Sequence, residues 1–325
     1  MEQENNRRVD SKIGRDGFKI NRQNQQSWQD WQTRKIPKEK WPQSLKEIPK
    51  KDIPKKLRIL GREPNWQNKR ICIVGSRRFS DYGKAVCQKI ISELRGYPVT
   101  IVSGLAYGID SISHRVAMEN DMDMIAILGS GLSKDVIYPK KHIDLAEKIL
   151  TAGGCLISEF DDSQPAAIWT FPQRNRIMAG ISDLVIIIEA AEKSGTMITA
   201  RLALDYNIDV AVVPGSIFNE TSKGTNKLLK EGAQPITCAD DILEILTIKK
   251  MDESDESLGK DLKNQKIAER LGEQELKIYK LLENPKDLNE ILEKSHLNIS
   301  ELNKILSTLE IEGLIHKIEN KICQK

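Results

Sequence analysis

The sequence is poor in aromatic residues and has no long apolar run. Phe, Trp and Tyr together make up 5% of its residues, whereas charged residues make up 30%, a balance that indicates a soluble protein. No apolar stretch approaches the roughly 20 residues that span a bilayer, and the polar start Met1-Glu2-Gln3-Glu4-Asn5 is unlike a secretory signal. We therefore expect no membrane partner.

Paired cysteines and metal-ligand spacings are also missing. The five cysteines are odd in number, scattered, and never arranged as Cys-x-x-Cys; they are Cys72, Cys87, Cys155, Cys238 and Cys323. This usage predicts reduced thiols and a cytoplasmic location. The four histidines show no ligand spacing either, so we expect no metal site.

Positive charge is concentrated near the N-terminus. Residues 1–70 hold 19 Lys and Arg against 9 Asp and Glu, whereas residues 71–325 hold 31 against 38. A nucleic acid would therefore bind the folded part through a local patch, helped by the tail. Residues 1–40 are rich in Gln, Asn, Arg and Lys, which predicts a disordered basic tail. Its Trp28 and Trp31 would either stack on bases or dock on the domain or a partner, and we favour docking.

Residues 41–248 have the pattern of an α/β domain, and 325 residues suffice for one such domain plus a smaller one. Prolines in residues 41–61 predict an extended arm packed on the domain edge. The apolar runs that we interpret as strands are 71–74, 99–102, 124–128, 155–158, 184–188 and 210–213. Helical patterns occur at 81–95, 108–119, 143–151, 174–180, 196–206 and 223–231. This alternation predicts a doubly wound, mostly parallel sheet.

The turn after the first of these strands has the features of a phosphate site. The run Ile71-Cys72-Ile73-Val74 ends at Gly75, which is followed by Ser76 and Arg77, and Ser80 can cap the next helix. A strand, a Gly-Ser turn with arginine and a helix N-terminus together suit a phosphate. The alternative is an ordinary βα turn with solvated arginines. The spacing is not that of a dinucleotide site, and we expect no cofactor.

Similar loops follow four other strands. Because ligands of doubly wound sheets bind outside the carboxyl ends of the strands, five converging Gly/Ser loops predict a rim of backbone donors for phosphates. The alternative is that the glycines serve only tight turns. The candidate residues in these four loops are Ser103, Gly104, Gly131, Ser194, Gly195, Thr196 and Lys223.

The stretch Phe171-Pro172-Gln173-Arg174-Asn175-Arg176 adds an aromatic ring, two arginines and an amide. We expect Arg176 to be buried in an ion pair with Asp183 or Glu189, which leaves Arg174 free to reach a phosphate. Lys140 and Lys141 follow Tyr138-Pro139 and add positive charge on the same side.

Five motifs together resemble those of the DNA-processing protein A (DprA, also called Smf) family over residues 41–247. The motifs are Gly75-x-Arg77-x-x-Ser80-x-Tyr82-Gly83, Ser103-Gly-x-Ala106-x-Gly108-Ile-Asp110, Phe171-Pro-x-Arg174-Asn175-Arg176-Ile-x-Ala-Gly180, Glu189-Ala-x-x-x-Ser194-Gly195-Thr196-x-Ile-Thr199-Ala200, and Pro214-Gly215 followed by Gly224-x-Asn226-x-Leu228. The resemblance implies an extended Rossmann-like domain that forms homodimers and binds single-stranded DNA without sequence preference. It also implies loading of the RecA recombinase on incoming strands during natural transformation.

The resemblance further implies roles for individual residues. Ser76 and Arg77 would contact phosphate, and Phe171 would border a base. Arg174 and Arg176 would hold the neighbouring loop or the strand. The sequence departs from the family at Ile168, where a Lys or Arg is frequent, and at Asp161-Asp162, which follow Ser158-Glu159 in place of a Pro-Pro-Gly segment. His142 also replaces the usual Asn after Tyr-Pro. These departures predict weaker or differently routed DNA contact.

Two alternatives come from other functional classes. The fold resembles that of the LOG-type phosphoribohydrolases, but Thr199 stands where their catalytic glutamate would be. A threonine cannot act as that acid at neutral pH, so we expect no enzyme activity. A nucleotide-binding or nucleotide-sensing protein that kept the fold and lost DNA binding stays open because of the departures at Ile168 and Asp161-Asp162.

The C-terminal region has its own pattern. Residues 249–265 form an acidic linker, and residues 266–325 show three short helical patterns followed by a small hairpin. This order predicts a winged-helix domain. Its third helix offers a net-negative set of exposed positions, which favours a partner-binding or regulatory module over a reader of duplex DNA. Those positions are Glu301, Asn303, Lys304, Ser307, Thr308, Glu310 and Glu312.

Overall fold

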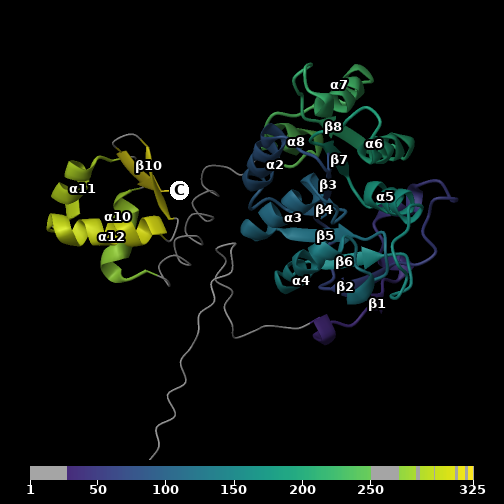
Figure 1. Cartoon of the computed structure of the whole chain (residues 1–325), viewed down its shortest axis with the longest axis horizontal. Helices are drawn as coiled ribbons and strands as arrows, with labels where there is room; N and C mark the ends of the chain where they lie inside the picture. Colours follow the sequence, from purple (N-terminus) through teal and green to yellow (C-terminus); the bar gives the residue numbers. More distant parts are fainter. Residues whose placement is uncertain are drawn as a thin grey trace, which may run out of the picture. The chain divides into compact units, whose positions relative to one another are not determined.

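A nine-stranded sheet forms the centre of the first of two units in this computed structural model (Figure 1). The units are Met1–Lys249 and Lys250–Lys325. The structure describes residues 28–249, 271–282, 286–295, 297–311, 314–318 and 321–324. The strand order is β1-β2-β6-β5-β4-β3-β7-β8-β9. The strands are Arg34–Lys35 (β1), Arg58–Gly61 (β2), Lys69–Val74 (β3), Val99–Ser103 (β4), Asp123–Ile127 (β5), Cys155–Ser158 (β6), Leu184–Ile187 (β7), Asp209–Val212 (β8) and Gln234–Pro235 (β9).

The seven neighbouring strands β6, β5, β4, β3, β7, β8 and β9 are all parallel. The direction in which the chain adds strands reverses between β3 and β7. From β3 the chain first adds β4, β5 and β6 on one side and then returns to add β7 and β8 on the other. Such a switch point leaves a crevice outside the carboxyl ends of the two strands, which is where doubly wound sheets bind ligands.

Helices cover both faces of the sheet, because each central strand is apolar on both faces. In β3, Ile71 and Ile73 belong to one core while Cys72 and Val74 belong to the other. Figure 1 shows α2, α3 and α4 on one face and α5 and α6 on the other. The helices of this unit are Gln43–Glu47 (α1), Asp81–Glu93 (α2), Ile109–Glu119 (α3), Ile143–Thr151 (α4), Thr170–Gly180 (α5), Gly195–Asp205 (α6), Lys223–Lys230 (α7) and Ala239–Ile245 (α8).

The predicted doubly wound, mostly parallel sheet is confirmed, but the two strands at one of its edges, β1 and β2, were not predicted. The arm before residue 61 enters the sheet: β2 pairs antiparallel with β6, and β1 pairs antiparallel with β2. Disorder up to residue 40 was a wrong prediction for residues 28–40. Trp28 and Trp31 pack against the core that contains α2 and α3, as the docking alternative expected, and Ile36 is buried. Residues 1–27 of the predicted tail lie outside the described residues.

The described residues of the second unit form three helices and a two-stranded hairpin around a core of their own. The elements are Glu273–Leu281 (α10), Leu288–Ser295 (α11), Ile299–Ile311 (α12), Ile315–Ile318 (β10) and Lys321–Gln324 (β11). This order agrees with the sequence pattern, and the winged-helix interpretation stays a prediction. The predicted acidic linker lies, but for Lys249, outside the described residues. In the described part of the chain, no helix is long and apolar enough to cross a membrane.

Candidate nucleic-acid interface

A cavity of about 660 Å³ lies at the switch point between β3 and β7. Its wall is formed by the turn after β3, the start of α3, the first turns of α5 and the loop that leads into α6. We call it the switch-point cavity. Nine of the predicted site residues line it, and these are Gly75, Ser76, Arg77, Phe171, Arg174, Asn175, Ser194, Gly195 and Thr196.

Arg77 is exposed at this cavity, and its guanidinium lies over the ring of Phe171 with 5.9 Å between Cζ and the ring centroid. This distance is within the range of a cation–π contact. None of the ion pairs found among the described residues involves Arg77. The side chain therefore presents positive charge beside an aromatic face.

The turn that carries Arg77 is held at both ends. The Ser76 hydroxyl accepts a hydrogen bond from the Arg78 amide at 3.0 Å and donates one to the Arg78 carbonyl at 2.7 Å. Ser80 caps α2, since its hydroxyl accepts a hydrogen bond from the Gly83 amide at 3.1 Å. The buried Glu189 carboxylate at the end of β7 accepts from the Ser80 amide at 2.9 Å and from its hydroxyl at 2.5 Å. The turn is thereby fixed to the neighbouring strand.

Gly108 leaves room for the same turn because it has no side chain. Its φ is +82°, and an added Cβ would overlap the Ser76 carbonyl oxygen and lie 2.7 Å from Cα of Arg77. We predict that Gly108→Ala destabilises the protein by about 1–3 kcal/mol beyond the cost of a positive φ alone, because the added methyl must push the turn aside. Urea denaturation with Gly153→Ala as control measures this difference, since Gly153 has φ +85° and no atom within 4 Å of its added Cβ. Equal losses in both variants would contradict the steric argument.

The N-terminus of α6 adds backbone donors to the cavity. Gly195 and Thr196 form its first turn and line the cavity, and a helix N-terminus favours a phosphate through its free N–H groups and its dipole. The Ser194 hydroxyl oxygen is buried and has no hydrogen-bond partner among the residues that the structure describes. This side of the cavity is therefore equipped to accept an anion.

Arg174 is buried beneath the cavity, so the prediction that it is free to reach a phosphate was wrong. Only 5% of the residue is exposed. Its Nη1 donates to the carbonyls of Gly104 at 2.5 Å and Ile127 at 2.9 Å, and its Nε donates to Oδ1 of Asn175 at 3.1 Å. Burial lowers the pKa of Arg174, and the nearby carboxylate of Asp110 opposes that effect.

The reason for the error lies in where α5 begins. We expected the helix from residue 174, but it starts at Thr170. Arg174 therefore lies in the second turn, on the same side of the helix as Ile177 and Met178, which are buried against the sheet. The helix phase turns the arginine inward.

Arg176 forms the expected ion pair but with a different partner. It pairs with Glu159 and also donates to the Asp52 carbonyl. Asp183 instead pairs with Arg70 at 2.9 Å, and Glu189 holds Ser80. Arg176 thus ties α5 to the loop after β6 and does not line the cavity.

The other predicted residues do not line the cavity; they serve packing or, in the case of Lys223, pair with Glu220, which does line it. The buried Ser103 hydroxyl donates to the Ile73 carbonyl at 2.7 Å. An added Cβ at Gly104 would overlap the Arg174 guanidinium, and one at Gly131 would overlap the carbonyl oxygens of Asp161 and Asp162. Lys223 pairs with Glu220 at 2.5 Å. Of the five loops predicted to form a rim of backbone donors, those after β3 and β7 hold predicted site residues that line the cavity, while the segments after β4 and β8 contribute Ala106, Glu220 and Thr221.

The departures at Asp161-Asp162 and Ile168 lie in the segment between β6 and α5, which precedes the cavity-lining Phe171 in the chain. The Ile168 side chain is 91% exposed, so this position has room for the Lys or Arg that is frequent in the family. Asp161 is paired with Lys56, and Asp162 is paired with Arg58 at 2.6 Å. The hydrogen bond from Lys56 lowers the pKa of Asp161. Much of the negative charge expected to repel DNA is thus balanced within the protein.

Sequence reasoning assigned no role to Asp110. This carboxylate is 5% exposed at the start of α3, and its Oδ2 accepts from the Ala106 amide at 3.3 Å. Burial raises the pKa of Asp110, and Arg174 is the main influence in the opposite direction. The only signal in the sequence was an acidic residue at the start of a helix beside apolar residues. The arginine that balances its charge, Arg174, lies more than sixty residues away in the chain.

The strand order, the helices on both faces and the cavity at the switch point define an α/β protein with a Rossmann-like sheet. The model of the family described as DNA recombination-mediator protein A matches residues 32–247, and the chain belongs to this family.

Curated relatives and solved structures agree. Protein Smf of Escherichia coli is 40% identical over 195 residues, which is 60% of this chain and 52% of the relative. DNA processing protein DprA of Bacillus subtilis is 38% identical over 180 residues, or 55% and 60% of the two chains. The chain thus spans between half and two thirds of the length of these relatives. The crystal structure of DNA processing protein A from Streptococcus pneumoniae is 36% identical with a TM-score of 0.60, and covers 67% of this chain and 75% of its own.

A further solved structure concerns DNA. It is DNA processing protein A from Helicobacter pylori, described for its single-stranded DNA binding mode, at 32% identity and a TM-score of 0.59. The match covers 66% of this chain and 96% of the other.

Proposed function

We propose that this chain binds single-stranded DNA without sequence preference at the switch-point cavity and acts as a recombination mediator. The observation that carries the proposal is the exposed Arg77 guanidinium over the Phe171 ring at a cavity lined by the N-terminus of α6. A cation for the phosphate and a ring for the base grip a strand without reading its sequence.

Each part of the cavity has a task in this proposal. Arg77 contacts the backbone, and the amides at the start of α6 donate hydrogen bonds to a second phosphate. Phe171 gives a base a surface to stack on. Arg174 and Glu189 touch no DNA; they hold the loops that present Arg77 and the cavity floor.

We extend the proposal to the cellular role that the family resemblance implies. The chain acts in the cytoplasm as a homodimer, protects incoming strands and loads RecA on them during natural transformation. The C-terminal unit serves a protein partner, because the exposed side chains of α12 include Glu301 and Glu310. An acidic helix face is poorly suited to a DNA groove.

Titration of a labelled oligo-dT strand at two salt concentrations tests the proposal. We expect tight binding whose logarithm falls with the logarithm of the salt concentration, with a slope of about −0.7 for each phosphate contacted. A strand of mixed sequence should bind equally well, and a duplex competitor should displace it poorly. Absence of binding at low salt would overturn the proposal.

A second function, binding of a single nucleotide, is supported by the cavity volume of about 660 Å³, which suits a small ligand. Thr199 is 2% exposed at this cavity and offers no acid, so we propose binding without catalysis. Incubation with a nucleoside monophosphate should release no nucleobase. Displacement of oligo-dT by a mononucleotide at micromolar concentration would favour this second function.

Replacing Ile168 by lysine is expected to raise the affinity for single-stranded DNA. Because this side chain is 91% exposed three residues before the cavity-lining Phe171, Ile168→Lys should leave stability unchanged and tighten oligo-dT binding severalfold, with a salt slope steeper by about 0.7. Leu204→Lys is the control, since Leu204 is 49% exposed at the far end of α6. If both variants tighten binding equally, the added charge acts through the whole protein and not through a contact at the cavity.

A further inference from the structure

The exposed aromatic side chains of the first unit gather at one edge of the sheet. Within residues 28–249 they are Phe79 (39%), Tyr82 (48%), Tyr107 (40%), Tyr138 (48%), Trp169 (53%) and Phe218 (89%). Each follows the carboxyl end of a parallel strand, in a loop or in the first turn of the next helix. Single exposed rings are normal on a protein surface, but their confinement to one edge is not. We call these six residues the aromatic rim.

Four rings of the aromatic rim are held in place by neighbours. Tyr107 packs edge-on against His142 with 4.8 Å between centroids, and Tyr138 lies 5.5 Å from Phe171. Trp169 packs edge-on against Phe160 at 5.7 Å. The Tyr82 hydroxyl donates to the Pro214 carbonyl at 2.9 Å. These rings keep an exposed face in a fixed orientation, which lowers the entropy lost when a planar ligand stacks on them.

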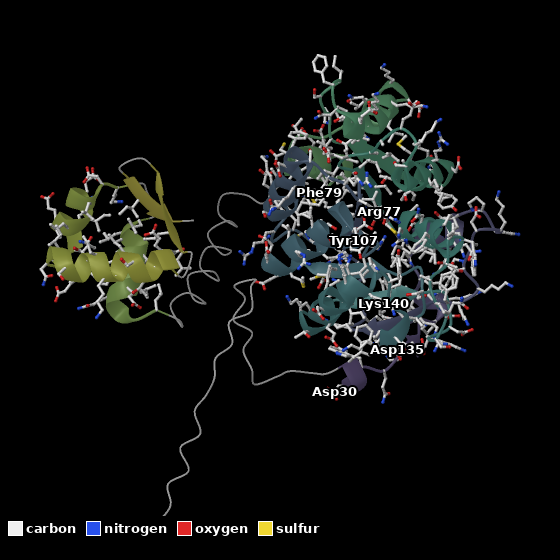
Figure 2. All side chains as sticks on the ribbon, viewed as in Figure 1. Asp30, Arg77, Phe79, Tyr107, Asp135 and Lys140 are labelled. Carbon is white, nitrogen blue, oxygen red and sulfur yellow. The ribbon has the colours of Figure 1, made fainter. Side chains whose placement is uncertain are left out.

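Exposed cations alternate with the rings. Figure 2 shows Phe79, Arg77, Tyr107 and Lys140 following one another across one side of the first unit. Arg78 and Lys141 are also exposed, and no ion pair found among the described residues involves either of them or Lys140. Asp135 lies beyond Lys140 in the same view.

We propose that the strand-binding site continues from the switch-point cavity along the aromatic rim, past Tyr107 to Tyr138 with Lys140 and Lys141. Bases stack on the two tyrosines, and the lysines hold the phosphates between them. The ligand class is an unpaired polynucleotide longer than the cavity can hold. This inference rests on the proposed function.

Polynucleotide chemistry explains the pattern better than a protein partner does. The centre of a protein–protein interface is depleted in lysine, whereas here Lys140 and Lys141 are exposed close in the chain to Tyr138 and belong to no ion pair found among the described residues. A chain of phosphates and planar bases matches this alternation of charge and ring. The strands β3, β4 and β5 are neighbours about 4.8 Å apart, so their loops form a continuous path.

Oligo-dT length dependence tests the inference. We would measure binding of strands of about 5 and about 20 nucleotides, within and beyond the span of common single-strand sites, to the wild type and to the double variant Tyr107→Ala/Tyr138→Ala. The double variant should lose about tenfold per ring in affinity for the long strand but at most a few-fold for the short strand, where only Tyr138 lies beside the cavity-lining Phe171. Tyr107→Phe/Tyr138→Phe should restore the long-strand affinity, because the rings are kept.

Two controls separate stacking from charge and from general damage. Lys140→Ala/Lys141→Ala should reduce the salt slope for the long strand by about 0.7 per lysine, whereas the tyrosine variants should leave that slope unchanged. Leu204→Ala removes an apolar side chain of similar exposure from another part of the unit and should have no effect. Thermal unfolding checks that each variant is folded.

The outcomes distinguish the two proposals. If the wild type binds neither strand, the proposed function fails and this inference fails with it. If the wild type binds both strands but the double tyrosine variant keeps full long-strand affinity, the inference alone is overturned, and the aromatic rim then serves a protein. An equal loss in Leu204→Ala would also overturn it.

Discussion

Arg174→Ala is expected to lower the free energy of unfolding by about 3–5 kcal/mol, the usual cost of removing one partner from a buried charge pair. The substitution leaves the carbonyls of Gly104 and Ile127 without the donors they have now. It also leaves the buried Asp110 carboxylate without its main balancing charge. Guanidinium chloride denaturation measures the loss as a shift of the midpoint.

A paired substitution isolates the electrostatic part of this cost. In Arg174→Ala/Asp110→Asn the aspartate charge is gone as well, so we expect part of the lost stability to return, and a double-mutant cycle with Asp110→Asn alone gives the coupling between the two sites. Arg77→Ala serves as the control, since Arg77 is exposed. An unchanged midpoint in Arg174→Ala would show that this arginine is not structural and would return it to the list of DNA contacts.

Arg77→Ala is expected to weaken oligo-dT binding by about 10- to 100-fold while the free energy of unfolding changes by less than about 0.5 kcal/mol. The variant loses a charge-assisted phosphate contact and the cation over Phe171. Its salt slope should be shallower by about 0.7 if one phosphate contact is lost. Fluorescence anisotropy at two salt concentrations measures both quantities.

Arg95→Ala is the matched control for that measurement. Arg95 is an exposed arginine just beyond the other end of α2, where it pairs with Asp121 at 3.4 Å. It should leave both affinity and salt slope unchanged. If Arg77→Ala binds as the wild type does, or if Arg95→Ala loses as much, the cavity does not hold the strand through Arg77.

The sequence allowed the sheet to be predicted because its central strands are buried on both faces and therefore read as short apolar runs between turn residues. Strand β2 escaped because it lies next to the edge strand β1 and is preceded by prolines, where apolar residues alone do not distinguish a strand from an arm. The pairing of β2 with β6 joins residues about one hundred positions apart, which a local pattern does not show.

The candidate site was predictable to the extent that parallel strands end at one edge. The Gly75–Arg77 and Ser194–Thr196 loops meet at the switch point for that reason. Gly104 and Gly131 carry the same glycine signal, but there the missing side chains make room for Arg174 and for the loop after β6. A single sequence does not separate these two uses of glycine.

The misplaced start of α5 shows how one local error changes a residue's role. Pro172 was taken to precede the helix, but proline fits the first turn, where its missing N–H has no intrahelical partner. A helix begun at Thr170 buries Arg174 and leaves Arg77 as the exposed arginine beside Phe171. The aromatic rim was likewise invisible in a composition of 5% aromatic residues, since its members come from five separate loops.

Ultraviolet cross-linking of bound oligo-dT, followed by mass mapping of the modified peptides, tests the central claim most directly. The account predicts cross-links on the peptides that hold Phe171 and Arg77, with Tyr107 and Tyr138 added when the strand is long. Cross-links confined to residues 1–27 or 250–325 would contradict it, because no residue of the switch-point cavity or of the aromatic rim would then be modified.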